Sequence, residues 1–391
     1  MKTPIVVIGS GLAGFGIARA LRRRDAQCEL IMICADSGDN YSKPQLSTAL
    51  ANKKTAGNLV LNSADEMAKQ LGMRFITHTR VTGIDQQTSQ VITHDGQRIS
   101  YGSLVLALGS DARKLKLEGD GAGEVMSVNS LNDYHCFQSK LRGKKSVLVI
   151  GGGLIGCEFA NDLLVSGVKV KLVESCTRLL NVLVPAQVSE KLESTLQANG
   201  AQIHLARCVS QVSVSENGFL VQLDNGETLG ADLVLSAVGV EPNVGLARDH
   251  GLKVNRGIVV DRYLQTSAKN IYAIGDCCEV EGRVLPYVAP IVAGSTALAA
   301  TLTGEPTEVV YGAMPIAIKT TLFPLAASPV PLGANGHWSI QTEDSGIKAL
   351  FEKTDGQLVG MALGGSTIKF RAELNKRLPS LMPARVSGND S

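Results

Sequence analysis

The sequence predicts an α/β fold in which two parallel-sheet domains precede a small α+β domain. Two segments, residues 5–14 and 147–156, repeat one pattern: a β-branched run, a glycine-rich turn, and the start of an apolar helical stretch. A strand that passes through such a turn into a helix is typical of parallel α/β sheets. A third observation is a change in character after Pro306, where prolines separate short β-like runs. The length of 391 residues is sufficient for several domains.

Each repeat predicts a strand–helix–strand unit whose two strands lie parallel in one sheet. In chain order, the expected elements of both sheets are a strand at 5–8, a helix at about 12–24, strands at 29–34, 104–108 and 147–150, a helix at about 154–166, strands at 169–173, 233–238 and 271–274, and a long helix from 289 to about 302. Residues from about 310 onward are expected to form the separate small domain, and the polar last stretch, residues 385–391, is expected to be frayed.

Both turns carry the spacing Gly-x-Gly-x-x-Gly, which is typical of dinucleotide-binding turns. The glycines are Gly9, Gly11, Gly14, Gly151, Gly153 and Gly156. The first glycine of each set allows a tight turn, the second admits a pyrophosphate to the backbone, and the third allows the helix to pack on the strand. Because a helix N-terminus offers free N–H groups and a positive dipole end, each turn predicts a phosphate site.

An acidic residue ends the strand that follows each turn. These residues are Asp36 in the first unit and Glu174 in the second, and each is placed to accept hydrogen bonds from ribose hydroxyls. A carboxylate at Glu174 repels the 2′-phosphate of NADPH, so the predicted coenzyme of the second unit is NADH. Arg178, four residues further on, complicates this assignment unless it binds the pyrophosphate or faces solvent.

A third motif lies far downstream, where the strand at 271–274 ends in Gly275-Asp276. This combination resembles the two-dinucleotide-domain flavoprotein reductases of the glutathione-reductase type, which have two Rossmann-like domains. The resemblance implies that Asp276 accepts a hydrogen bond from the ribityl chain of FAD, and that Gly109 and Gly239 mark the crossings between domains. We therefore expect an FAD-binding domain of residues 1–111 and 240–309, an NAD-binding domain of 112–239, and a C-terminal α+β domain of 310–391.

The segment 41–47, Tyr-Ser-Lys-Pro-Gln-Leu-Ser, narrows the resemblance. Disulfide reductases of this family carry redox cysteines at the matching place, and this chain has none there. The segment is similar to the Tyr-x-(Arg/Lys)-Pro-x-Leu-Ser of reductases that pass electrons to small iron proteins. Because it has Lys and not Arg at the third position, it resembles the rubredoxin and flavorubredoxin reductases. The segments 153–162, 255–261 and 315–320 strengthen that match. The vicinal pair Cys277-Cys278 is not expected to have a redox role.

The resemblance also implies individual roles. Lys43 and Glu158 are the expected catalytic residues: Lys43 stabilises negative charge on the flavin, and Glu158 pairs with Lys43 or holds the nicotinamide carboxamide. The expected FAD-binding residues are Gly9, Ser10, Gly11, Leu12, Gly14, Ala35, Asp36, Lys43, Pro44, Val81, Gly109, Gly275, Asp276, Val288 and Lys319. The expected NAD-binding residues are Gly151, Gly153, Gly156, Glu158, Glu174 and Gly239.

The predicted function is hydride transfer from NADH to FAD, followed by single-electron transfer to a small acidic iron carrier. Rubredoxin is the first choice, and flavorubredoxin and ferredoxin are the alternatives. Two alternatives belong to other classes of function: an NADH:quinone reductase and a non-catalytic NADH-sensing flavoprotein. The basic residues expected to face the carrier are Lys43, Lys53, Lys54, Lys319, Lys369 and Arg371.

Composition excludes several other classes of function. A formal charge of +2 is too small to predict non-specific nucleic-acid binding. No apolar run approaches the roughly 20 residues of a membrane helix, so no membrane partner is expected. No histidines and cysteines have the spacing of a metal site, so no metal is predicted. The eight cysteines include no Cys-x-x-Cys pair, and reduced thiols in a cytoplasmic protein are expected.

Overall fold

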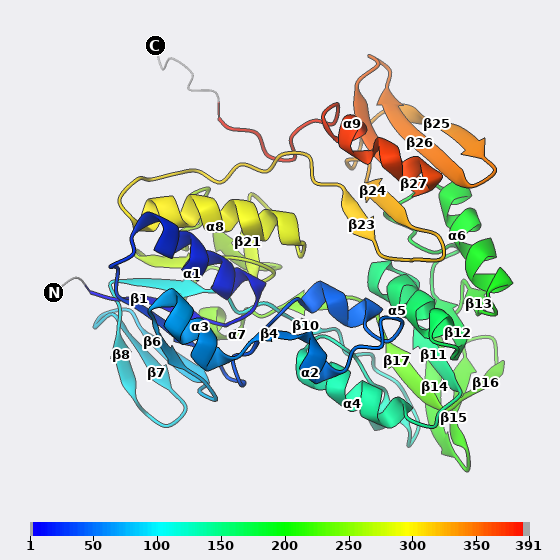
Figure 1. Cartoon of the computed structure of the whole chain (residues 1–391), viewed down its shortest axis with the longest axis horizontal. Helices are drawn as coiled ribbons and strands as arrows, with labels where there is room; N and C mark the ends of the chain where they lie inside the picture. Colours follow the sequence, from blue (N-terminus) through cyan, green and yellow to red (C-terminus); the bar gives the residue numbers. More distant parts are fainter. Residues whose placement is uncertain (1–2, 386–391) are drawn as a thin grey trace.

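The first domain is built on a five-stranded parallel sheet with the order β20-β9-β1-β2-β5 (Figure 1). The computed structural model describes residues 3–385. The strands are β1 (Ile5–Ile8), β2 (Leu30–Ile33), β5 (Arg74–Ile76), β9 (Ser103–Leu106) and β20 (Ile271–Ala273). Helix α1 (Leu12–Arg24) connects β1 to β2 and packs beside α8 (Val288–Leu302) on one face of this sheet. Strand β20 comes from a distant part of the chain, so this domain is discontinuous.

The second domain repeats this plan in a four-stranded parallel sheet with the order β13-β12-β11-β17. Its strands are β11 (Ser146–Ile150), β12 (Lys169–Glu174), β13 (Gln202–Leu205) and β17 (Leu233–Ser236). Its helices are α4 (Leu131–Leu141), α5 (Leu154–Val165) and α6 (Ala186–Ala198), and a three-stranded antiparallel sheet adds β14 (Val209–Ser215), β15 (Gly218–Leu223) and β16 (Thr228–Ala231). The predicted fold class, two similar α/β domains, is confirmed.

Two short strands join the first and second domains. β10 (Ser110–Ala112) pairs antiparallel with β18 (Val240–Pro242), so the chain enters and leaves the second domain side by side. The two predicted boundaries of the NAD-binding domain, at 111/112 and 239/240, fall in or beside these two strands.

The third domain is a five-stranded antiparallel sheet with the order β23-β24-β27-β26-β25. It contains β23 (Ile316–Ile318), β24 (Leu325–Ser328), β25 (Gly336–Glu343), β26 (Gly346–Lys353), β27 (Leu358–Gly365), the 3-10 helix η3 (Ser366–Phe370) and α9 (Arg371–Asn375). Its buried Phe323 and Ile347 belong to the same apolar core as Phe159 and Leu163 of α5. The third domain therefore packs directly on the second, as Figure 1 shows.

Smaller elements connect these sheets. They are β3 (Asn40–Tyr41), η1 (Lys43–Thr48), α2 (Ala56–Leu59), β4 (Val60–Asn62), α3 (Ala64–Leu71), β6 (Val81–Asp85), β7 (Gln90–Thr93), β8 (Arg98–Ser100), η2 (Ala122–Glu124), α7 (Gly245–Asp249), β19 (Ile258–Val260), β21 (Cys278–Val280) and β22 (Arg283–Val284). No helix within residues 3–385 is long and apolar enough to cross a membrane.

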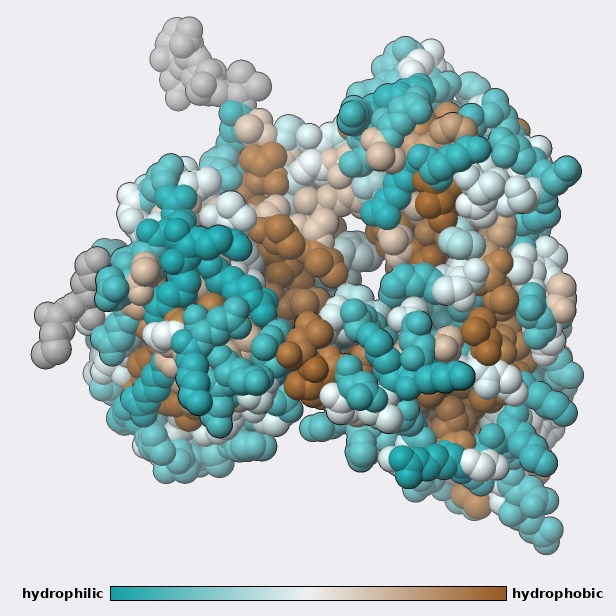
Figure 2. Space-filling model, in the orientation of Figure 1, coloured by the Kyte–Doolittle hydropathy of each residue, from teal (hydrophilic) through white to brown (hydrophobic). Residues whose placement is uncertain are grey.

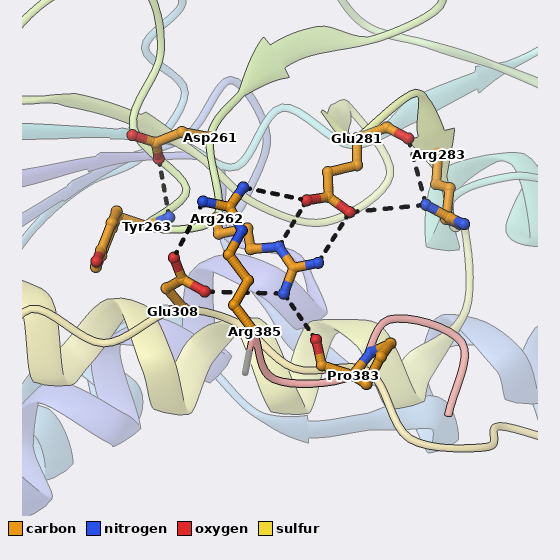
Figure 3. Close-up of polar contacts among 8 residues, drawn as sticks. All are labelled: Asp261, Arg262, Tyr263, Glu281, Arg283, Glu308, Pro383 and Arg385. Carbon is orange, nitrogen blue, oxygen red and sulfur yellow. Dashed lines mark hydrogen bonds and ion pairs between the residues drawn. The ribbon is translucent and has the colours of Figure 1, made fainter. Parts of the chain in front are cut away.

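The chain returns from the third domain to the first, where Arg262 holds it (Figure 3). The Arg262 guanidinium donates to Glu281 at 2.6 Å and to the carbonyl of Pro383 at 2.7 Å, and it lies 3.7 Å from Glu308. Arg385 pairs with the same two carboxylates, at 3.5 and 3.6 Å. The sequence suggested that the polar stretch from residue 385 is frayed, and for Arg385 this is wrong because both acids hold it. Residues 386–391 lie outside the described part of the chain.

We predict that Arg262→Met lowers the melting temperature more than Arg377→Met, which removes an ion pair with Glu352 inside the third domain. The hydrogen bond from Arg262, and then its charge, lower the pKa of Glu281. A lowered folded-state pKa gives stability that is complete above the ordinary glutamate value, roughly 4.3, and is lost as pH falls through the folded value. The difference between wild type and Arg262→Met should therefore shrink in acid, as calorimetry would measure. Equal losses in both variants would contradict this role.

Candidate functional site

The first glycine turn has the shape that a bound pyrophosphate needs. Gly9 has φ of +108°, and a Cβ there would overlap the carbonyl oxygen of Ala107. A Cβ at Gly14 would overlap the carbonyl oxygen of Gly9, so helix and strand touch at this point. Around the Cβ position of Gly11 the space is open, and Gly11 is the N-cap residue of α1, with no side-chain cap hydrogen bond. The N-terminus of α1 therefore has no side-chain cap and lies beside open space.

The second turn reproduces this geometry. Gly151 also has φ of +108°, and a Cβ there would lie 2.7 Å from the carbonyl oxygen of Ala237. A Cβ at Gly156 would overlap Gly151, and the space above Gly153 is open. Gly153 is the N-cap residue of α5, again with no side-chain cap hydrogen bond. The two turns thus fit two dinucleotides by the same backbone arrangement.

The two predicted ribose acids lie beside these turns in different ways. Glu174 ends β12, and its carboxylate accepts from the N–H of Gly152 at 2.5 Å and from that of Cys176 at 2.7 Å. Asp36 follows β2 and accepts from the N–H of Gly38 at 3.1 Å. Arg178 donates to the carbonyl of Asn181 at 3.2 Å. Glu174 is therefore the charged group that directly contacts the second turn.

Asp276 and Lys43 meet where the first domain passes into the second. Asp276 follows β20, and its carboxylate accepts from the hydroxyl of Ser110 at 2.8 Å. The ammonium of Lys43 lies 4.0 Å from the same carboxylate. Burial lowers the pKa of Lys43, and the charges of Asp276, Asp111 and Asp133 oppose that shift without cancelling it. Ser110, which the sequence analysis did not single out, directly follows the predicted crossing residue Gly109.

Glu158 is fully buried on α5 and binds groups from the two other domains. One carboxylate oxygen accepts from the Ser47 hydroxyl at 2.5 Å and from the Lys319 ammonium at 2.5 Å. The other oxygen accepts from the backbone N–H of Lys319 at 2.9 Å. In the described part of the chain, Lys43 pairs with Asp276 and not with Glu158, so the expected Lys43–Glu158 pair is wrong. The cause is the third domain, which delivers Lys319 from the end of β23.

The remaining predicted residues lie around these groups. Val81 begins β6 and is buried, whereas Val288 begins α8 and is 45 % exposed. Figure 2 shows apolar surface gathered in a hollow between the lobe of the first domain and the lobe of the other two. Gly109, Gly239 and Gly275 follow the ends of β9, β17 and β20 respectively. Ser10, Leu12, Ala35 and Pro44 are partly or largely exposed beside the first turn, Asp36 or Lys43.

The chain matches the family described as pyridine nucleotide-disulphide oxidoreductase over residues 3–301. It belongs to this family. Residues 308–378 match a second description, rubredoxin binding C-terminal domain. This membership agrees with the predicted cofactors, FAD and NADH.

The curated relatives cover nearly the whole chain. A rubredoxin-NAD(+) reductase of Alcanivorax borkumensis is 46 % identical over 381 residues, 97 % of this chain and 100 % of the relative. A protein of the same name from Acinetobacter baylyi is 41 % identical over 98 % of this chain and 100 % of the relative. A nitric oxide reductase FlRd-NAD(+) reductase of Aliivibrio fischeri is 39 % identical over 94 % of this chain and 97 % of the relative.

Solved structures agree on the fold. A ferredoxin reductase of Rhodopseudomonas palustris has a TM-score of 0.87 at 26 % identity, over 98 % of this chain and 96 % of that one. The NADH:rubredoxin oxidoreductase of Clostridium acetobutylicum has a TM-score of 0.80 at 22 % identity, over 100 % and 98 %. The second likeness concerns the fold alone.

Unlike the disulfide branch that gives this family its name, the chain has no described disulfide near the site. Cys277 and Cys278 are both buried and unpaired. Burial raises the pKa of Cys277 to about 11 and that of Cys278 well above the ordinary value. Both thiols therefore stay protonated at neutral pH. Residues 3–385 contain no group of three or more His, Cys, Asp or Glu side chains arranged to hold a metal.

We predict that Asp276→Ala weakens FAD retention by roughly 1.5–3 kcal/mol, the value of a charge-assisted hydrogen bond. Ser110→Ala is the matched control, because it removes the hydroxyl that donates to Asp276 and leaves the carboxylate in place. Flavin absorbance per chain after gel filtration, together with titration of apoprotein with FAD, measures the effect. Equal retention in Asp276→Ala and wild type would show that this carboxylate does not hold the flavin.

Proposed function

We propose that this protein is a rubredoxin–NAD(+) reductase that oxidises NADH and reduces rubredoxin. The observation that carries the proposal is the third domain, which matches a rubredoxin-binding domain and reaches the centre of the molecule through Lys319. When bound, FAD supplies the conversion of a two-electron hydride donor into single electrons. The protein supplies binding, orientation and charge.

The two glycine turns are the proposed pyrophosphate sites, the first for FAD and the second for NADH. The open space above Gly11 and Gly153 supports this assignment, because a pyrophosphate there meets unshared helix N–H groups. Glu174 is the proposed ligand of the NADH ribose and repels a 2′-phosphate. Asp36 is the proposed ligand of the FAD ribose.

Lys43 and Glu158 are the proposed catalytic residues. Lys43 presents a cation beside Asp276, and a fixed cation stabilises negative charge that develops nearby. The charge of Glu158 is balanced by Lys319, so we assign Glu158 the task of holding Ser47 and Lys319 in place as well as orienting the nicotinamide. The hydrogen bond from the backbone N–H of Lys319 to Glu158 supports the holding role, because it fixes the end of β23 to α5.

Rubredoxin is favoured over a flavorubredoxin because the two rubredoxin reductases are 46 % and 41 % identical to this chain, against 39 % for the nitric oxide reductase partner. A quinone reductase and a sensor have no specific observation in their favour. We also propose a cytoplasmic location, which the free thiols of Cys34, Cys157, Cys277 and Cys278 support.

The direct test is NADH oxidation measured with a panel of acceptors: rubredoxin, the rubredoxin domain of a flavorubredoxin, ferredoxin and a water-soluble quinone. We expect the highest kcat/KM with rubredoxin and a much lower value with ferredoxin and quinone. If quinone were reduced as efficiently as rubredoxin, the assignment of the acceptor would be wrong. If NADH failed to reduce the flavin without any acceptor, the reductase function itself would be wrong.

The basic residues named in the sequence analysis are the proposed docking surface for an acidic carrier. Lys53, Lys369 and Arg371 are exposed, and Lys348 and Lys369 lie 5.3 and 5.1 Å from the centre of the Phe370 ring. Positive charge and an aromatic face in one place suit an acidic protein surface, chiefly by raising its association rate.

We predict that the double charge reversal Lys53→Glu, Lys54→Glu raises KM for rubredoxin several-fold and leaves KM for NADH unchanged. Reversal of Lys253 and Lys269, which are exposed near the opposite, amino-terminal edge of the first sheet, is the control. Rubredoxin reduction should also slow as salt rises from 0.1 M to 1 M, because the Debye length falls from about 10 to about 3 Å. Stopped-flow measurement of both half-reactions checks this. A salt response shared by the NADH half-reaction would leave these lysines without a docking role.

A further inference from the structure

Asp162 is a second buried carboxylate on α5, one helical turn beyond Glu158. It is 1 % exposed, and both of its oxygens accept hydrogen bonds from the backbone of the first domain. One oxygen accepts from the N–H of Leu50 at 3.0 Å, and the other accepts from the N–H of Ala51 at 2.9 Å. This carboxylate therefore crosses from the second domain to the first.

The two amides lie directly behind the segment that carries Lys43 and Ser47. That segment is η1 (Lys43–Thr48), which packs against α5 and is followed by a turn at residues 49–53. The second domain also holds the far side of this turn, because Tyr134 and Gln138 of α4 donate to the carbonyl of Lys54 at 2.9 and 3.0 Å. The backbone after Ser47 is thus fixed by side chains of another domain.

Burying the Asp162 carboxylate costs desolvation free energy, so the interactions that it makes must serve a purpose. Asp162 has no ion-pair partner among the residues that the structure describes. Burial is the main reason that the pKa of Asp162 rises to about 6; the two N–H bonds oppose the rise, and the negative charge of Glu158 adds to it. An apolar side chain at this position would avoid the desolvation. An apolar side chain, however, has no acceptor and could not bind the N–H groups of Leu50 and Ala51.

We propose that Asp162 is a positioning residue for the reductase reaction, one that holds η1, with Lys43 and Ser47, against α5 by binding the two amides behind it. The proposal rests on the function proposed above. Asp162 makes no described hydrogen bond to Lys43 or Ser47. It therefore acts on them through the backbone of residues 50 and 51, which follows η1. Loss of the carboxylate should loosen η1 and leave the second glycine turn and Glu174 unchanged.

The test compares Asp162→Asn and Asp162→Ala with Asp232→Asn. Asp232 is a matched control, because its carboxylate also accepts from two consecutive amides, Lys145 at 2.6 Å and Ser146 at 2.9 Å, but within the second domain. Asn keeps the size of Asp and one acceptor oxygen, so Asp162→Asn is the variant chosen to fold. The readouts are hydrogen exchange of peptides covering residues 44–54 in the FAD-loaded protein, and the NADH half-reaction in stopped flow.

We expect Asp162→Asn to raise exchange in residues 44–54 at least threefold and to lower the limiting rate of the NADH half-reaction at least tenfold. The NADH concentration that gives half of that rate should stay the same, and Asp232→Asn should change none of these values. Faster exchange with an unchanged limiting rate would reduce Asp162 to a structural contact and overturn the proposal. Unchanged exchange, or equal effects in Asp162→Asn and Asp232→Asn, would overturn it as well. Wild-type protein that failed to reduce rubredoxin would count against the proposed function and leave the exchange result intact.

Discussion

A carboxylate that is buried where the three domains meet must have partners, and the assembly of the domains supplies these partners. Glu158 is fully buried, and an unpaired charge in such a place costs several kcal/mol. Its partners are the hydroxyl of Ser47 in the first domain, and the ammonium and N–H of Lys319 in the third. The second domain therefore supplies the buried charge, and the first and third domains supply the groups that neutralise it and bind it by hydrogen bonds. This network links η1 of the first domain, α5 of the second domain and the end of β23 in the third domain.

Helix α5 organises that network along its length. Its N-terminus faces the open space of the second glycine turn. One turn later Glu158 binds both neighbouring domains, and Asn161 then binds the third domain through Thr321 at 3.0 Å and the N–H of Leu322 at 2.9 Å. Asp162 completes the series toward the first domain. Polar side chains that are at most 2 % exposed on a helix of apolar character identify α5 as a connector as well as a core element.

The sequence predicted those features that local chemistry determines. The spacing of the glycines requires a particular backbone shape, and an acid at the end of the next strand follows from the same unit, so both fingerprints and the fold class could be inferred directly. The expectation that Glu158 pairs with Lys43 or holds the nicotinamide carboxamide came only from the resemblance, and nothing in the local sequence indicated that this carboxylate is buried. Its true partner could not, because Lys319 lies 161 positions away and reaches Glu158 only when the third domain packs on the second.

The same limit applies to Asp162 and Arg262. Nothing near Asp162 in the sequence indicates that its oxygens bind amides 112 and 111 positions earlier. Arg262 binds a carbonyl 121 positions later, and the polar composition of the chain end gave the opposite expectation for Arg385. Long-range hydrogen bonds of buried polar groups are decided by how the domains assemble, and a short motif contains no information about that assembly.

A double-mutant cycle measures whether Glu158 and Lys319 form one energetic unit that joins the domains. The free energy of unfolding would be measured for wild type, Glu158→Gln, Lys319→Met and the double variant, all loaded with FAD. We expect each single variant to be destabilised and the double variant to lose less than the sum of the two single losses, with a coupling energy of roughly 0.5–3 kcal/mol. Strictly additive losses would show that the two side chains act independently and do not join the domains as a pair.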